Sequence, residues 1–288
     1  MKSLKQETTL QKKKKGKSLT DSDFVIKLKD FLYPLLMFLT GTKVRYKVIK
    51  VNDYTTIPNK PIIFVANHSA FQDTPIMLRV TGRRSYIFSG TQNLAFIDWV
   101  FFMLNGTLWV DRKSKEDMAA SKDGILEYLK KNQSILWFPE GTWNLTPNRL
   151  MMSMKWGIID MARQADAQII PAALHYDREN NLCHVKFGKP MAGEILNHKA
   201  AAIVTLRDAM ATLRWDLLCN QPLLHRAEII PEELKKEAYQ VIDEYPPLDW
   251  AYERSCIYKP YPKVKPVPPD VVPTFKNAFL FKKNRNRI

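Results

Sequence analysis

The sequence predicts an α/β fold with a largely parallel central sheet flanked by helices. Short apolar runs alternate along the chain with longer amphipathic segments, as is typical of strands connected through helices. The run PIIFVA at 61–66 is apolar at every position, which favours a strand covered on both faces. Polar residues follow several of these runs. They indicate a binding or catalytic site, because ligands gather at the carboxyl ends of parallel strands.

Composition and charge limit the class of protein. The chain has 288 residues, of which 45% are hydrophobic, so it can bury a large core and is not disordered throughout. Lys and Arg number 44 against 29 Asp and Glu, which gives a formal net charge of +15. This surplus predicts a polyanionic partner, either nucleic acid or an anionic membrane surface. Cys183, Cys219 and Cys256 show no metal-ligand spacing, so we expect a reducing compartment and no metal site.

Residues 1–45 form a predicted basic tail and amphipathic helix. Lysines cluster at 12–15, and apolar residues recur at three- and four-residue steps over 22–41. Pro34 is expected to kink this helix or to mark its restart. The segment is too short and too charged to span a bilayer. Both an interfacial membrane anchor and an ordinary core-packing helix fit this pattern.

The main α/β domain is predicted at 46–222 and a C-terminal extension at 223–288. Apolar runs bounded by turn residues predict strands at 61–66, 85–90, 107–111, 134–139, 167–176 and 183–191. Longer segments between them predict helices at 93–104, 114–131, 150–164 and 200–218. The extension is expected to be helical up to Pro246 and then to form a proline-rich, basic arm.

The first chemically informative segment is VANHSAFQD at 65–73. His68 stands just after the predicted strand 61–66, and Asp73 follows five positions later. A histidine at this place, paired with a carboxylate, is arranged like a catalytic general base. The carboxylate would hold the imidazole in the useful tautomer and stabilise the imidazolium.

Two further segments place polar groups after predicted strands. In WFPEGTW, Glu140, Gly141 and Thr142 follow the strand at 134–139, where Gly141 would let backbone amides approach a ligand. An ordinary β-turn leading to a helix cap also fits this heptapeptide. In NGTLWVDR, Gly106 makes a turn and Arg112 ends a strand. A guanidinium suits phosphate, although a solvated surface arginine is the alternative.

Taken together, these segments resemble the glycerolipid acyltransferases, the lysophospholipid or 1-acyl-glycerol-3-phosphate acyltransferase family. The resemblance covers about 61–190, and its four motifs occur in the family's order. The segments that carry it are NHSAFQD at 67–73, with the Asn-His-x4-Asp pattern, GTLWVDR at 106–112, FPEGT at 138–142 and AQIIPAAL at 167–174. The segment MKWGIID at 154–160 is similar to the one that the family carries between its third and fourth motifs.

The resemblance implies transfer of a fatty acyl group from acyl-CoA or acyl carrier protein to a hydroxyl of a lysophospholipid or glycerol-phosphate acceptor. His68 and Asp73 would be catalytic, with no covalent intermediate, no metal and no cofactor. Arg112 and Lys155 would hold the acceptor phosphate, and backbone amides of the first or third motif are candidate oxyanion donors. The full set of expected substrate-binding residues is Asn67, Gly106, Arg112, Glu140, Gly141, Thr142 and Lys155.

One position departs from the family pattern. Trp143 stands where the third motif often continues with a basic residue, so an acceptor with another headgroup, read by Trp143 and Asn144, is an open alternative. A second alternative is that Trp143 simply rests on lipid or on the core. We expect a peripheral or monotopic protein on the cytoplasmic side of a membrane, with no nucleic-acid partner because no such motif occurs.

Two other classes of protein were weighed against acyl transfer. A serine hydrolase lacks its Gly-x-Ser-x-Gly elbow in this sequence. A catalytically silent lipid-binding protein stays open, since the sequence alone does not bring His68 and Asp73 together.

Overall fold

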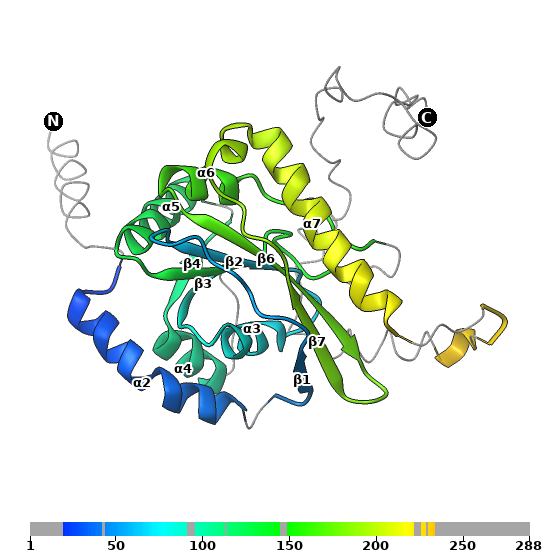
Figure 1. Cartoon of the computed structure of the whole chain (residues 1–288). Coiled ribbons are helices and arrows are strands. Elements are labelled where there is room, and N and C mark those ends of the chain that lie inside the picture. The colour runs from blue at the N-terminus through cyan, green and yellow to red at the C-terminus, as the bar shows by residue number, and fades with distance from the viewer. Residues whose placement is uncertain are drawn as a thin grey trace, which may run out of the picture.

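The computed structural model describes residues 20–41, 44–90, 96–112, 114–144, 149–221, 226–228 and 230–233. Within these ranges, seven strands form one sheet in the order β1-β7-β6-β2-β5-β3-β4 (Figure 1). Every neighbouring pair is parallel except β6 and β7, which are antiparallel. The strands are β1 Lys47–Lys50, β2 Ile62–Ala66, β3 Ser85–Gly90, β4 Thr107–Val110, β5 Ser134–Trp137, β6 Gln168–Asp177 and β7 Leu182–Phe187.

Helices cover both faces of the sheet. Figure 1 shows α5, α6 and α7 on one side and α3 and α4 on the other, with α2 outermost. Helix α2 packs against both α3 and α4. The helices are α2 Asp23–Gly41, α3 Asp73–Thr81, α4 Phe96–Asn105, α5 Lys115–Lys130, α6 Gly157–Gln164 and α7 Lys199–Cys219, with short 3-10 turns η1 Gly193–Asn197 and η2 Arg226–Glu228.

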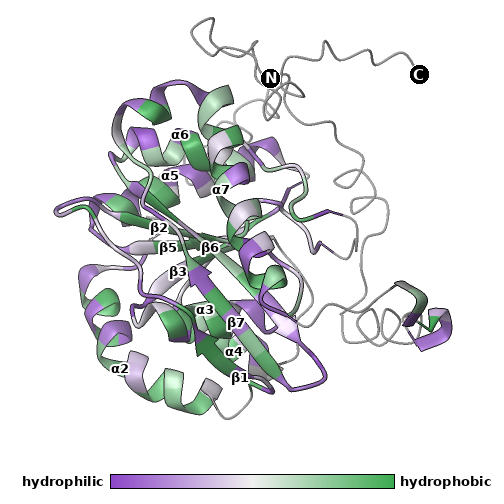
Figure 2. Ribbon diagram, turned by 45° about the vertical axis from the view of Figure 1, so that its right-hand side comes forward, coloured by the Kyte–Doolittle hydropathy of each residue, from purple (hydrophilic) through white to green (hydrophobic). Residues whose placement is uncertain are grey.

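The central strand β2 joins the two halves of the core. Ile63 and Val65 belong to the apolar cluster that contains residues of α5, α6 and α7. The alternate residues Ile62, Phe64 and Ala66 belong to the cluster on the α3 and α4 side. All five positions are buried, because successive side chains of a strand point to opposite faces. Figure 2 shows the resulting hydrophobic strands between the two helical layers.

The largely parallel α/β fold is confirmed, and three details differ from the prediction. The helix expected at 150–164 begins only at Gly157, because backbone contacts hold residues 151–155 as an extended loop. Strand β1 was not predicted, and β7 ends at Phe187 instead of continuing to 191. Pro34 lies inside a continuous α2. The lysine cluster at 12–15 and the proline-rich arm lie outside the described residues.

The described α-helices range from eight residues in α6 to 21 residues in α7. None of them combines the length and the apolar content needed to cross a membrane.

Candidate active site

His68 and Asp73 meet at the carboxyl end of the central strand. Strand β2 ends at Ala66, and Asp73 is the first residue of α3. The Asp73 carboxylate reaches back over the turn and accepts hydrogen bonds from the amides of Ser69 and Ala70, at 2.6 and 2.8 Å. The same oxygen, Oδ2, lies 2.8 Å from Nδ1 of His68. The five-residue spacing is therefore a turn that Asp73 itself closes, and it directs the Nδ1 edge of the imidazole toward the carboxylate.

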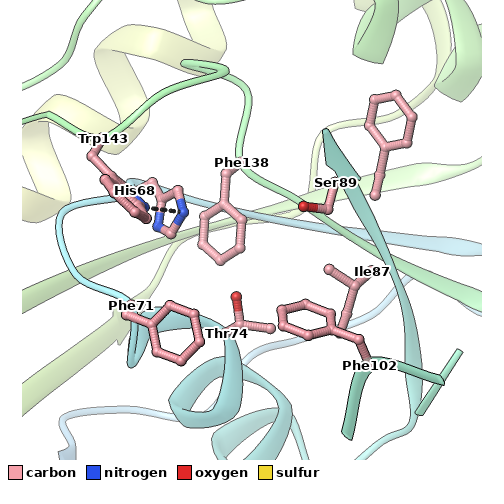
Figure 3. A pocket seen from close by; sticks show the side chains of 9 residues that line it. His68, Phe71, Thr74, Ile87, Ser89, Phe102, Phe138 and Trp143 are labelled. Atoms are coloured by element: carbon pink, nitrogen blue, oxygen red, sulfur yellow. Dashed lines mark hydrogen bonds between the residues drawn. The ribbon is translucent and has the colours of Figure 1, made fainter. Parts of the chain in front are cut away.

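Trp143 contacts the other edge of the imidazole. Its indole Nε1 donates a hydrogen bond to Nε2 of His68 at 2.5 Å, as the dashed line in Figure 3 shows. An accepting Nε2 and a donating Nδ1 define the neutral tautomer that a general base requires. Phe138 stacks on the imidazole, with 4.2 Å between ring centroids. The indole thus occupies the nitrogen that would receive a proton from a substrate.

A small cavity lies beside His68. Its volume is about 30 Å³, enough for about one water-sized group. A larger group would fit only if lining side chains such as Trp143 moved. The lining comes from strand β3, from helices α3 and α4, and from the loops that follow β2 and β5. Figure 3 shows it from close by: His68, Phe71, Thr74, Ile87, Phe88, Ser89, Phe102, Phe138 and Trp143.

Asn67 fixes the loop that carries His68. Its side-chain oxygen accepts from the amide of Leu174 at 2.8 Å, and its side-chain nitrogen donates to the Leu174 carbonyl at 3.2 Å. Asn67 is fully buried, so these bonds satisfy polar groups that water does not reach. Asn67 thereby joins the first motif to strand β6 and fixes the start of the loop that carries His68.

Glu140 is turned into the protein and away from the cavity. One carboxylate oxygen accepts from the amide of His68 at 3.3 Å and the other from the amide of Met152 at 2.7 Å. Burial raises the pKa of Glu140 to about 7, although the Met152 amide, the charge of Arg214 and the His68 amide oppose the rise. Glu140 is placed to position the His68 loop. Glu140 is expected to bind substrate, but both of its carboxylate oxygens accept hydrogen bonds from backbone amides of the protein.

Arg112 lies at the same edge of the sheet, over two neighbouring loops. It donates to the carbonyl of Gly141, and its guanidinium lies against Gly90, where a Cβ atom would come within 2.8 Å of Nε. Lys155 is brought to this edge by its amide, which donates to the carbonyl of Pro139 at 2.8 Å. Both cations therefore flank the third motif.

Gly106 is not brought to the site. Its carbonyl accepts from the amide of Ile87 in β3, and it precedes the first residue of β4. Because β3 and β4 run parallel to β2, Gly106 lies at the amino edge of the sheet, opposite His68. Its φ of +100° and the Tyr86 ring against it explain the glycine structurally.

Thr142 follows Gly141 in the third motif and is buried. Its hydroxyl has no hydrogen-bond partner among the described residues. Three of the residues expected to bind substrate lie at or next to the site. Asn67 precedes His68, Glu140 accepts from the His68 amide, and Gly141 accepts from Arg112.

Two contacts of the site were missed by the sequence reasoning. The hydroxyl of Tyr176, near the end of β6, donates to Oδ1 of Asp73. Trp143 was singled out only as a departure from the family pattern, and its bond to His68 was not foreseen. The available signal for Tyr176 was its place at the carboxyl end of a predicted strand.

The sequence matches known proteins over the region that contains this site. Residues 48–175 match the family model described as Acyltransferase. The chain is 30% identical over 148 residues to 1-acyl-sn-glycerol-3-phosphate acyltransferase of Saccharomyces cerevisiae, covering 49% of this chain and 46% of that protein. It is 28% identical over 152 residues to the probable 1-acyl-sn-glycerol-3-phosphate acyltransferase of Mycoplasma pneumoniae, with 50% and 53% covered. The chain thus spans about half the length of these curated relatives.

A solved structure has a similar fold. The 1-acyl-sn-glycerophosphate acyltransferase PlsC from Thermotoga maritima aligns with a TM-score of 0.55 and 14% identity, covering 68% of this chain and 84% of that one. At this identity the likeness concerns the fold alone. The sequence match, the fold and the order of the motifs agree in likening residues 48–175 to the acyltransferase family.

Proposed function

We propose that the protein transfers a fatty acyl group from an acyl thioester to a hydroxyl of a lysophosphatidate-type acceptor. The observation that carries the proposal is the His68–Asp73 pair, which lies 2.8 Å apart at the carboxyl end of the central strand. The curated relatives are named 1-acyl-sn-glycerol-3-phosphate acyltransferases, which supports the same acceptor class. Acyl-CoA and acyl carrier protein are both admissible donors.

The proposed chemistry needs no nucleophilic side chain. The acceptor hydroxyl attacks the thioester carbonyl while Nε2 of His68 takes the hydroxyl proton. Asp73 stabilises the imidazolium that forms, and the proton then passes to the departing thiolate as the tetrahedral intermediate collapses. The oxygen–carbon bond replaces the sulfur–carbon bond, so an ester and a free thiol are the products.

The phosphate of the acceptor is assigned to Arg112 and Lys155. Both flank the third motif, and Arg112 already contacts its Gly141 carbonyl. The planar guanidinium suits bidentate binding of a phosphate. Trp143 donates to Nε2 of His68, the nitrogen that would take the proton of the acceptor. This contact favours, as a second candidate, an acceptor whose headgroup packs on an indole.

A membrane surface is the proposed location of the reaction. Helix α2 is bound to the domain through polar groups: Tyr33 donates to the Leu78 carbonyl at 2.6 Å, and Asp30 pairs with Arg84 at 2.6 Å. Ile26 and Leu36 of this helix are buried, whereas its other large apolar side chains face outward, with Phe31 80% and Phe38 71% exposed. An outward apolar face of this size favours contact with lipid. The membrane patch, as we name it, comprises Phe24, Leu28, Phe31, Leu32, Leu35, Phe38 and Leu39 of α2 with Trp99, Met103 and Leu104 of α4.

Thiol release tests the reaction. Wild type, His68→Ala and the control His198→Ala are compared in liposomes with acyl-CoA or acyl carrier protein and a panel of lysolipid acceptors. His198 is exposed and precedes α7, so its variant should match wild type. We expect acceptor-dependent release that falls by about 100-fold or more in His68→Ala. Absence of release with every pair would favour a lipid-binding protein without catalysis, whereas unchanged release in His68→Ala would refute His68 as the general base.

Vesicle binding tests the membrane patch. Burying one phenylalanine is worth about 1.5–3 kcal/mol, so Phe31→Asp together with Phe38→Asp should weaken vesicle binding by about 100-fold or more. The control Trp215→Asp changes a residue of α7 that is 57% exposed and should bind like wild type. Binding to vesicles of phosphatidylcholine with and without phosphatidylglycerol separates the apolar contribution to vesicle binding from the contribution of lipid charge. Equal loss in both variants would contradict the assignment.

A further inference from the structure

Tyr176 approaches Asp73 from the side opposite His68. Its hydroxyl donates to Oδ1 of the carboxylate. The other oxygen, Oδ2, accepts from Nδ1 of His68 and from the amides of Ser69 and Ala70. The two carboxylate oxygens thus have separate donors, and Asp73 is fully buried between them. Tyr176 lies one residue beyond the part of the chain that matches the family model.

The tyrosine is itself held in place. Strand β6 pairs with β2 on one side and with β7 on the other, where Tyr176 lies opposite Cys183. Its ring packs edge-on against Tyr46, with 4.7 Å between centroids. Burial and the neighbouring Asp73 carboxylate raise the pKa of Tyr176. The phenol therefore stays protonated and remains a donor across the physiological pH range.

Tyr176 and Asp73 are both absent from the lining of the cavity beside His68. An effect of Tyr176 on the reaction must therefore pass through Asp73. We propose that Tyr176 is a positioning residue, which holds the plane of the Asp73 carboxylate so that Oδ2 faces Nδ1 of His68. This inference rests on the acyl transfer proposed above.

Tyr176→Phe separates positioning from substrate binding. It keeps the ring and removes the hydroxyl, so Oδ1 loses its hydrogen bond to the hydroxyl and the carboxylate gains freedom to rotate. Loss of a hydrogen bond to a charged group should lower kcat by about tenfold or more. The KM values for donor and acceptor should stay within about twofold, since no substrate contact is lost.

The pH–rate profile gives a readout that a merely structural role would not move. Without the tyrosine donor, negative charge concentrates on Oδ2 and stabilises the imidazolium, so the acid limb of kcat/KM should move to higher pH. Four other titratable groups act on this network and remain in the variant, so the displacement of the limb reports the lost hydroxyl. They are Tyr46 before β1, Cys183 in β7, Glu140 after β5 and Arg214 in α7.

Tyr54→Phe is the matched control. The Tyr54 hydroxyl donates to the Thr81 carbonyl at 2.9 Å, so this variant also loses a tyrosine hydrogen bond but leaves Asp73 untouched. We expect the kcat and acid limb of wild type for Tyr54→Phe. The proposal is overturned when Tyr176→Phe is folded and retains the kcat and pH profile of wild type, or when both variants lose activity equally.

A second measurement tests the proposal in the case that Tyr176→Phe does not fold. Replacing Tyr176 with 3-fluorotyrosine makes the phenol a stronger donor of nearly the same size, and it should move the acid limb to lower pH. The Nδ1–H proton resonance of His68, assigned by its loss in His68→Ala, should also shift. An unchanged resonance and an unchanged limb would refute the role of Tyr176. Absence of acyl transfer by wild type, with a shifted resonance, would instead reject the proposed function and retain the Tyr176–Asp73–His68 contact.

Discussion

Replacing Asp73 with asparagine tests the electrostatic part of the site. The carboxylate oxygen lies 2.8 Å from Nδ1 of His68, so the two charge centres are about 4 Å apart once the imidazolium forms. At an effective dielectric constant of about 20, unit charges at this separation interact by about 4 kcal/mol. Asparagine keeps the shape and removes the charge, so kcat should fall by about a thousandfold.

The geometry also indicates that Asp73→Asn can keep the hydrogen bonds of the turn and so remain folded. The new amide oxygen can keep the Oδ2 position beside Ser69 and Ala70, and the amide nitrogen then faces the Tyr176 hydroxyl, which rotates to accept. Thermal unfolding verifies the fold, and thiol release with acyl-CoA measures kcat. Asp166→Asn is the control, because that side chain is 78% exposed and pairs with Lys60, far from the site in the sequence. A folded Asp73→Asn with kcat within about tenfold of wild type would refute the assignment of Asp73.

Three further outcomes follow from single residues. Glu140 has a pKa raised from 4.5 to about 7, so the folded state binds more protons between these values and loses up to about 3 kcal/mol of stability as pH rises through 7. Urea unfolding should show a flatter pH dependence for Glu140→Gln, and equal slopes would contradict this. Gly106→Ala should cost about 2–3 kcal/mol by urea unfolding, because φ is +100° and a Cβ atom would lie 2.5 Å from a buried tyrosine ring. Gly82→Ala, with open space around it, should cost less. Trp143→Phe removes the donor on Nε2 of His68 and should lower the acceptor KM by about two- to tenfold at constant kcat; a raised KM would show that the indole binds the acceptor.

The buried strands were the predictable part of the fold. The runs at 61–66 and 167–176 correspond to β2 and β6, because strands covered on both faces are apolar at nearly every position. Strand β1 escaped prediction, since its four residues KVIK are exposed at both ends and pair only at the edge of the sheet. The methionines at 151, 152 and 154 suggested a helix. They are buried instead in a loop that Glu140 and the Pro139 carbonyl hold.

The candidate site was predictable as far as its motifs reach. His68 and Asp73 are five residues apart, and a local turn brings them together. The contacts of Tyr176 with Asp73 and of Trp143 with His68 join residues 103 and 75 positions apart. No spacing rule relates such residues, because the order of strands in the sheet determines their proximity. Gly106 shows the converse, since it belongs to a motif and yet lies at the opposite edge of the sheet.

Helix α4 separates the cavity from the membrane patch by the thickness of one helix. Phe102 lines the cavity, whereas Trp99 and Met103 of the same helix are exposed. In the proposed orientation, the thioester carbonyl carbon that is attacked lies within about 10 Å of the lipid boundary. An acceptor then exchanges sideways between bilayer and enzyme without entering water. The rate would accordingly follow the mole fraction of acceptor within the membrane, and diluting the acceptor with inert lipid would slow turnover even when its bulk concentration is held constant.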